Sequence, residues 1–124
     1  MVGKIYTSIT PFYDVKSQKN SFKSRPVLII GDIRNDDYTV LPISKVSKRQ
    51  YLDSKYDVSV KMAEYPNLNL TCDSYIRVHK QTTVHKTLIR NFITDLQEEY
   101  EDLYISVLSL LEERNAELLN DALN

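Results

Sequence analysis

The chain has 124 residues, 42% of them hydrophobic, which suffices for one compact core but not comfortably for two. A single cysteine and only two glycines exclude an intramolecular disulfide, a cysteine-rich zinc site, a Walker phosphate loop and a dinucleotide-binding glycine motif. Residues 1–90 hold fifteen Lys/Arg and eight Asp/Glu, a net charge of +7, whereas residues 91–124 hold one and nine, a net charge of −8; this division predicts a basic working surface beside a separate acidic element.

Five short stretches are typical of β-strands, because apolar residues in them either alternate with polar ones or run together. The segments between them are rich in Asn, Asp, Ser, Lys and Pro, which favour turns. Several strands at short spacing predict a small β-barrel. The predicted strands are residues 4–9, 26–33, 38–43, 56–60 and 74–79, and the turn-rich segments are residues 13–24, 34–37, 44–55 and 64–73.

The last third of the chain has the period of an amphipathic helix, predicted from about residue 95 to the low 120s. Thr94 followed by Gln97 fits a capping box, and Glu98 and Glu99 suit the positive end of the helix dipole. We expect the apolar stripe to pack on the barrel or on a second copy of the chain, since the polar face is acidic and does not suit a membrane. The stripe consists of Tyr100, Leu103, Tyr104, Val107, Leu108, Leu111, Leu118 and Leu119.

The N-terminal residues lack the apolar core of a signal peptide, and no apolar run approaches the roughly 20 residues that cross a bilayer. We therefore expect a cytoplasmic protein that does not engage a membrane. We also expect residues 1–124 to form a single domain.

Residues that could carry the commonest enzyme chemistries stand in the wrong contexts. No serine lies between the glycines of a nucleophile elbow, and Cys72 is predicted to be a packing residue. His79 and His85 are six residues apart, on one side of a continuous strand, but no carboxylate spacing completes a metal site around them. The sequence predicts neither a metal nor another cofactor.

Bases and hydroxyl groups gather instead beside the predicted strand ends, where small β folds place their sites. Lys23, Ser24 and Arg25 precede the second strand, and Ser44 and Lys45 follow the third. Aromatic residues interleaved with basic ones in the turn-rich segments add stacking surface next to positive charge, which suits a single-stranded nucleic acid. They are Tyr13, Phe22 and Tyr51, among Lys16, Lys19, Lys23, Lys48 and Arg49. The residues expected to contact such a strand are Tyr13, Lys16, Lys19, Phe22, Lys23, Lys45, Lys80, Gln81 and Thr82.

Three blocks of sequence occur in an informative order: "GKIYTSITPFYD" with "KSRPVLII", then "VLPIS", then "DSYIRVHKQTTVHKTLI". Together with the terminal helix they resemble the MazF/PemK family of toxin-antitoxin endoribonucleases over nearly the whole chain. The resemblance implies a mainly β fold, an SH3-like small barrel with a C-terminal α-helix. It also implies a homodimer, an antitoxin protein as partner, and metal-independent cleavage of single-stranded mRNA.

By position, Arg25 matches the family's catalytic arginine and Ser44 its catalytic threonine or serine. The implied reaction is attack of a ribose 2′-hydroxyl on the neighbouring phosphate, which builds negative charge on the phosphoryl oxygens. A guanidinium offers permanently charged donors to those oxygens, and a hydroxyl adds another donor. Pro26 fixes the backbone after Arg25, so that the side chain starts from a rigid strand entrance.

The segment "VHKQTTVHK" departs from the family wording, because Thr82 stands where an arginine is common. His79 or Lys80 could supply the missing positive contact. His79 is also a candidate general acid or base, since an imidazole titrates near neutral pH. The alternative is that His79 is a strand-end residue bonded to backbone.

Two other functions remain open from the sequence. CcdB-type toxins share the architecture but bind DNA gyrase through a helix with an aromatic or apolar tail, and the tail "NDALN" has no aromatic residue. The other alternative is an RNA-binding module without catalysis.

Overall fold

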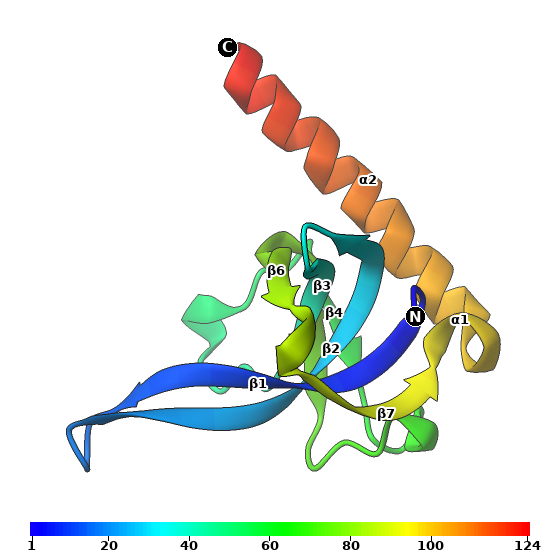
Figure 1. The fold of residues 1–124 in the computed structure, drawn as a ribbon. Helices are drawn as coiled ribbons and strands as arrows, with labels where there is room; N and C mark the ends of the chain where they lie inside the picture. Colours follow the sequence, from blue (N-terminus) through cyan, green and yellow to red (C-terminus); the bar gives the residue numbers. More distant parts are fainter.

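The computed structural model describes the backbone of residues 1–124 and every side chain except those of Phe12 and Tyr13. Seven strands form one curled antiparallel sheet, a half-barrel from which a long helix projects (Figure 1). The strands are β1 (Lys4–Asp14), β2 (Lys19–Arg34), β3 (Asp37–Ser44), β4 (Asp57–Val60), β5 (Ser74–Arg77), β6 (Thr82–His85) and β7 (Ile89–Asp95). The helices are α1 (Leu96–Glu99) and α2 (Glu101–Leu123), with 3-10 turns η1 (Arg49–Tyr51), η2 (Pro66–Leu68), η3 (Val78–Lys80) and η4 (Lys86–Leu88).

The strands follow the order β4-β5-β3-β2-β1-β7, and β6 pairs with β3 beside β5. This arrangement confirms the prediction of a mainly β, small-barrel fold with a C-terminal helix. Each of the five predicted strands has a counterpart in the sheet. The fifth was predicted to run to residue 79 but stops at Arg77, where the chain enters η3.

Two strands were missing from the prediction, β6 and β7. β6 is a four-residue strand that pairs with the first half of β3, and β7 pairs with β1. Both are defined by partners more than forty residues away, and in β7 only Thr94 is buried. Neither has the run of buried residues that marks β2 or β3, so local sequence pattern gave no signal.

The outer halves of β1 and β2 form a long two-stranded arm, residues 9–24, which reaches beyond the barrel (Figure 1). The prediction of a turn-rich segment over residues 13–24 was therefore wrong for most of its length. The register runs without a break from Ile9 opposite Ser24 to Asp14 opposite Lys19. Cross-strand pairing overrides the polar composition, and only the tip, residues 15–18, is a turn.

The core lies between the concave face of the sheet and the helices. Leu28 and Leu41 point into it, while their neighbours Ile29 and Val40 belong to a second apolar cluster on the opposite face. Ile5, Leu28 and Leu41 are each fully buried, and such aliphatic side chains contribute about 2 kcal/mol apiece. Both faces of β3 and of the middle of β2 are thus covered, which specifies the register between the two strands.

The helical segment begins one residue later than predicted, with Asp95 as its N-cap instead of Thr94. The Asp95 carboxylate accepts a hydrogen bond from the Glu98 amide at 3.1 Å. Thr94 is buried in β7, so it is not free to cap. The helix is also interrupted at Tyr100, whose backbone (φ −137°, ψ 62°) separates α1 from α2.

Only the first half of α2 packs as predicted. Leu103, Tyr104 and Val107 are buried against the barrel, but Leu118 and Leu119 are 46% and 65% exposed. Figure 1 shows the end of α2 pointing away from the sheet. No helix in the described chain combines the length and apolarity that a membrane crossing requires.

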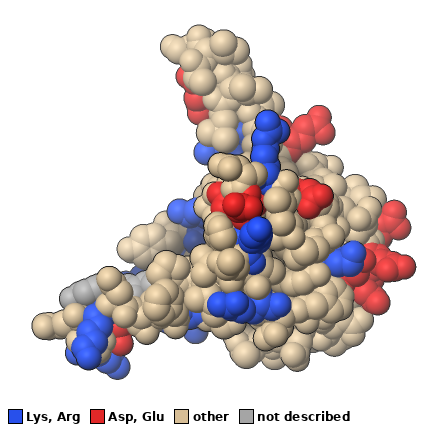
Figure 2. Space-filling model, in the orientation of Figure 1, with Lys and Arg blue, Asp and Glu red and all other residues tan. Residues whose placement is uncertain are grey.

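The opposite charges predicted from the sequence are only partly separated on the surface. Figure 2 shows basic side chains on the arm and across the middle of one face. Acidic ones gather toward the side where α1 lies, but others lie on α2 and among the basic side chains in the middle of this face. The first turns of α1 and α2 contain Glu98, Glu99, Glu101 and Asp102. Acidic side chains at helix N-termini are stabilised by the helix dipole.

Candidate functional site

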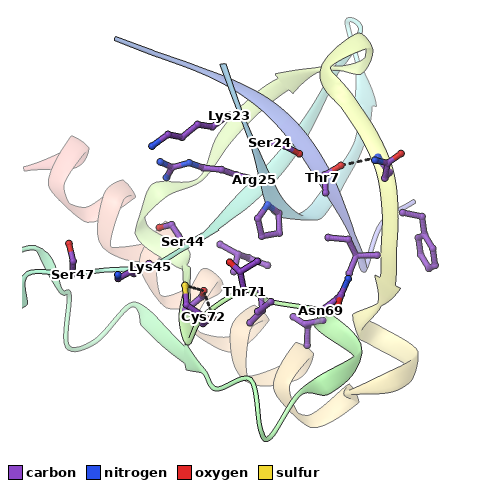
Figure 3. Close-up of a pocket in the computed structure, with 18 residues that line it drawn as sticks. Thr7, Lys23, Ser24, Arg25, Ser44, Lys45, Ser47, Asn69, Thr71 and Cys72 are labelled. Atoms are coloured by element: carbon purple, nitrogen blue, oxygen red, sulfur yellow. Dashed lines mark hydrogen bonds between the residues drawn. The ribbon is translucent and has the colours of Figure 1, made fainter. Parts of the chain in front are cut away.

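A groove of about 810 Å³ opens at the end of the sheet from which the arm emerges (Figure 3). One wall is formed by β2 from Lys23 to Pro26, just before the strand becomes buried, and by the end of β3. The other comes from β7 and the irregular segment 68–74. Its basic residues are Lys23, Arg25 and Lys45, and no Asp or Glu is among the described residues that line it.

Arg25 and Ser44 come from adjacent strands, each two residues beyond the last pair that β2 and β3 share at this end. That pair is Val27 opposite Pro42, and Ser44 itself pairs with Tyr75 of β5. Both side chains line the groove, and Arg25 is exposed in it while Ser44 is half-buried.

Local structure fixes the direction of Arg25. It precedes Pro26, which is half-buried at the point where β2 enters the core, and both lie in the unbroken β1–β2 register. Figure 3 shows the Arg25 and Lys23 side chains running in the same direction along the upper wall, with Ser44 below. Two cationic groups and a hydroxyl therefore face one open space.

Polar groups that the sequence analysis did not single out complete the far wall and floor. The Thr7 hydroxyl accepts a hydrogen bond from the backbone N–H of Asn91 at 3.0 Å, which links β1 to β7 inside the groove. Ser74 donates to the Cys72 carbonyl at 3.0 Å, so Cys72 lies on the groove wall instead of in the core. Asn91 and Thr7 are 84 residues apart, and no local motif could have joined them.

The predicted RNA contacts divide between the groove and the arm. Lys23 and Lys45 line the groove. Lys16, Lys19 and Phe22 lie on the arm, and Phe22 is 68% exposed. The side chain of Tyr13 lies outside the part of the chain that the structure describes.

His79, Lys80, Gln81 and Thr82 are not among the groove residues. They occupy η3 and the beginning of β6, and His79 and His85 are separated by a change of element instead of sharing one strand. The His79 side chain is 17% exposed, with Nδ1 3.6 Å from the Asp57 carboxylate. The structure therefore does not bring His79 to Arg25 and Ser44.

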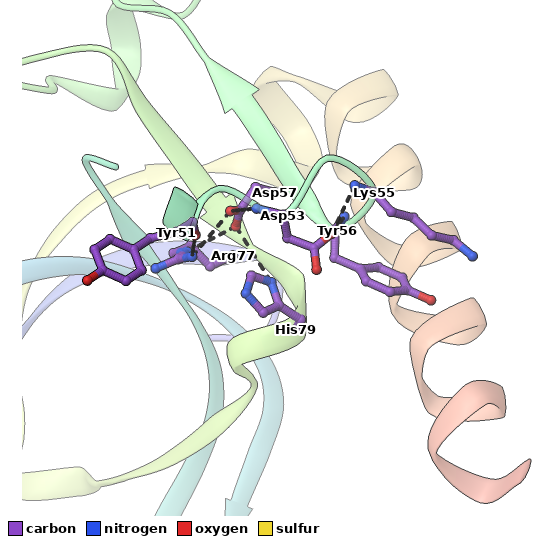
Figure 4. Close-up of polar contacts among 7 residues, drawn as sticks. All are labelled: Tyr51, Asp53, Lys55, Tyr56, Asp57, Arg77 and His79. Atoms are coloured by element: carbon purple, nitrogen blue, oxygen red, sulfur yellow. Dashed lines mark hydrogen bonds and ion pairs between the residues drawn. The ribbon is translucent and has the colours of Figure 1, made fainter. Parts of the chain in front are cut away.

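His79 belongs to a polar cluster centred on Asp57 (Figure 4). The Arg77 guanidinium donates to the fully buried Asp57 carboxylate at 3.0 Å and to the Tyr51 carbonyl at 2.8 Å. The Asp53 amide donates to the same carboxylate at 2.8 Å. Hydrogen bonds from the Tyr56 and Lys55 amides lower the pKa of Asp53, the Tyr56 amide contributing most.

Sequence reasoning missed this cluster because its members are scattered, and Asp57 and Arg77 meet only through the pairing of β4 with β5. Within the described residues, no three His, Cys, Asp or Glu side chains are grouped so that they could bind a metal ion.

The family model of PemK-like, MazF-like toxins of type II toxin-antitoxin systems matches residues 3–109. The match includes all the residues of the groove and ends inside α2, so residues 110–124 lie beyond it. Comparison with curated proteins gave no match.

Proposed function

The chain belongs to the PemK-like, MazF-like toxins of type II toxin-antitoxin systems, and on this premise we propose that it is an endoribonuclease. Its substrate is single-stranded RNA bound in the groove, and Arg25 and Ser44 are the catalytic residues. Neither a metal nor another cofactor takes part.

The observation that carries the proposal is that Arg25 of β2 and Ser44 of β3 line the same groove, which has three basic residues and no described carboxylate. A guanidinium can donate two parallel hydrogen bonds to a phosphate, and it remains charged at every working pH. The Ser44 hydroxyl adds a neutral donor on the same side. Donors fixed where negative charge develops are the largest contribution to catalysis in many enzymes.

The reaction needs no nucleophile from the protein. The ribose 2′-oxygen loses its proton and bonds to the adjacent phosphorus, the bond from phosphorus to the 5′-oxygen breaks, and that oxygen takes up a proton. The products are a 2′,3′-cyclic phosphate and a 5′-hydroxyl. Arg25 and Ser44 orient the phosphate and stabilise the charge on its non-bridging oxygens.

A type II toxin has an antitoxin partner, and we propose that an acidic antitoxin segment occupies the same groove as RNA. The absence of carboxylates among the described lining residues favours an anionic occupant. We further propose a homodimer in solution. Sedimentation velocity at micromolar concentration would reveal the dimer, and an antitoxin that binds without inhibiting RNA cleavage would contradict a shared groove.

The decisive experiment replaces the ribose 5′ of the cut bond by deoxyribose. We expect cleavage to stop and binding to remain, because the attacking 2′-hydroxyl is gone while the phosphates are intact. Addition of EDTA should change neither. Cleavage of the deoxy-substituted strand, or loss of activity in EDTA, would contradict the mechanism.

Two outcomes of the same assay would support the alternatives. Binding of unmodified RNA without any cleavage would indicate an RNA-binding module. Intact RNA together with inhibition of DNA gyrase would indicate a gyrase-directed toxin.

A further inference from the structure

The segment that follows β3, residues 45–51, is named here the basic segment because it contains Lys45, Lys48 and Arg49. Its first residues line the groove, and Lys48, Arg49 and Tyr51 are exposed beyond them. A single 3-10 turn, η1, is its only regular structure. One end is continuous with β3, so its course depends on what holds the other end.

The other end is held by Arg77. Its Nη2 donates to the Tyr51 carbonyl at 2.8 Å, while Nε and Nη2 bind the Asp57 carboxylate at 3.0 and 3.3 Å. The Arg77 side chain is only 16% exposed. A guanidinium held by three hydrogen bonds through Nε and Nη2 has little rotational freedom, so Tyr51 is fixed relative to β4 and β5.

Asp57 closes a tight turn, residues 53–57. The Asp57 amide donates to the Asp53 carbonyl at 3.1 Å, and the Asp53 amide donates to the Asp57 carboxylate at 2.8 Å. The Asp53 carboxylate in turn accepts from the Lys55 and Tyr56 amides. A displacement of this turn would therefore move the carboxylate that orients Arg77.

The C-terminal part of α2, residues 110–124 and here the helix extension, packs on this turn. The Tyr56 hydroxyl donates to the Glu117 carboxylate at 2.8 Å, and Lys55 pairs with Glu113 at 3.0 Å. The Arg114 guanidinium lies 5.7 Å from the centre of the Tyr56 ring and also binds Glu117. Figure 4 shows Lys55 and Tyr56 reaching toward α2, while Arg77 and His79 point to Asp57 on the other side.

These contacts form a continuous series from the helix extension through the 53–57 turn and Arg77 to the basic segment. We propose that the helix extension positions the basic segment beside the groove, so that Lys48, Arg49 and Tyr51 form an additional RNA-contacting wall. This inference rests on the proposed function for its substrate. The family match ends at residue 109, so the extension is a feature of this chain that the family match does not account for.

The chemistry of the wall suits the backbone of a single strand. Lys48 and Arg49 supply charge for phosphates, and Tyr51, 61% exposed, supplies a stacking face. Such contacts act on binding and not on the reacting phosphate. Loss of positioning should therefore raise KM and leave kcat unchanged.

The test compares two double variants of the full chain with equal charge changes. Glu113→Gln/Glu117→Gln weakens the extension's contacts with Lys55 and Tyr56. Glu112→Gln/Asp121→Asn changes two exposed acidic residues of the same helix that form no side-chain hydrogen bond or ion pair with a described residue of the barrel. We expect the first to raise KM for RNA about three- to tenfold with kcat within about twofold, and the control to change neither.

A second readout follows the basic segment itself. Trypsin cleaves after Lys48 and Arg49 only when the segment opens, so its nicking rate reports local opening. We expect nicking about three- to tenfold faster in Glu113→Gln/Glu117→Gln than in the control or the wild type. Arg77→Lys, which keeps the charge but loses the fork, should shift KM and nicking in the same direction.

Unchanged nicking in Glu113→Gln/Glu117→Gln would overturn the positioning role, and faster nicking with unchanged KM would overturn the RNA-contacting wall. If the wild-type protein binds a labelled single-stranded RNA without cleaving it, the proposed endoribonuclease fails. The Kd values of the two double variants then replace KM, and a higher Kd in Glu113→Gln/Glu117→Gln alone supports the inference. If the wild type neither binds nor cleaves RNA, the wall is overturned as well.

Discussion

The groove and the region around α1 adjoin each other along β7 and have opposite chemistry. The groove has Lys23, Arg25 and Lys45 and no carboxylate among its described residues. The α1 side contains Asp95, Glu98 and Glu99, with Lys4 as its one described cation. The two regions share Phe92 and Ile93 as a boundary. The net charge of −1 therefore hides a basic groove that can receive an anion and an acidic region directly beside it.

Among variants that test the difference between the two regions, we expect the largest effect from Arg25→Ala in the groove. Removal of a donor to a developing oxyanion costs about two to three orders of magnitude in cleavage rate, and we expect that loss here with folding retained because Arg25 is exposed. Arg34→Ala, an exposed arginine at the opposite end of β2, is the control. Near wild-type cleavage in Arg25→Ala, measured with labelled RNA, would show that Arg25 is not catalytic.

The next largest difference between the two regions is expected in how variants of each change the salt dependence of RNA affinity. Phosphate contacts from Lys23, Arg25 and Lys45 alone give a log–log slope near −2, which lowers RNA affinity about 20-fold between about 50 and 200 mM salt. If Lys48 and Arg49 also contact phosphates, the slope should steepen to about −3.5. Lys45→Gln should make the slope less steep by about 0.7. Lys4→Gln, on the acidic side, should leave it unchanged. Equal slopes for both variants, measured with non-cleavable deoxy-substituted RNA, would place the strand elsewhere.

Acid should weaken the helix extension before it affects the basic groove. The Tyr56 hydroxyl, followed by Arg114, lowers the pKa of Glu117 below its ordinary value of 4.5. The stability from this carboxylate is therefore complete above about pH 4.5 and is lost as the pH falls through the lowered folded value. Urea unfolding at pH 7 and about pH 3 should show a larger loss for the wild type than for Glu117→Gln. A loss of the same size in Glu117→Gln would mean that the contact with Tyr56 is not stabilising; Glu112→Gln should behave like the wild type.

The smallest effect is expected from His79. Because it lies on Asp57 and outside the groove, His79→Gln should leave kcat for RNA within about twofold of the wild type. Its pH–rate profile should also match the wild type. A large fall in kcat would show that the bound RNA draws His79 into the reaction.

Sequence patterns revealed those parts whose partners are near or whose burial is strong. Buried runs in β2 and β3 and the period of α2 were sufficient for the core, and the family resemblance singled out Arg25 and Ser44. Both residues line the groove, and their catalytic role stays a prediction. β7, Thr7 with Asn91, and Asp57 with Arg77 remained hidden, because each is defined by pairing between distant segments with no local periodicity.

For α2, in contrast, the sequence predicted apolar packing over a longer segment than the structure shows. Its apolar period continues to Leu118 and Leu119, and the prediction extended packing along with it. Past Leu111 the contacts with the barrel change from apolar to polar, through Glu113, Arg114 and Glu117. Periodicity predicts which residues share a face, but it does not state how far the partner surface extends.

The pairing of β1 with β7 has a consequence for the order of events during synthesis. The Gly3 backbone donates a hydrogen bond to the Ile29 carbonyl and accepts one from the backbone N–H of Gln97. The Thr7 hydroxyl accepts one from the backbone N–H of Asn91 in the groove. A domain emerges from the ribosome N-terminus first, at about 5–20 residues per second. The far wall of the groove therefore cannot form until β7 has been translated and released from the exit tunnel. The nascent chain therefore lacks a complete groove during most of its synthesis. Chains arrested before residue 89, where β7 begins, should leave RNA intact.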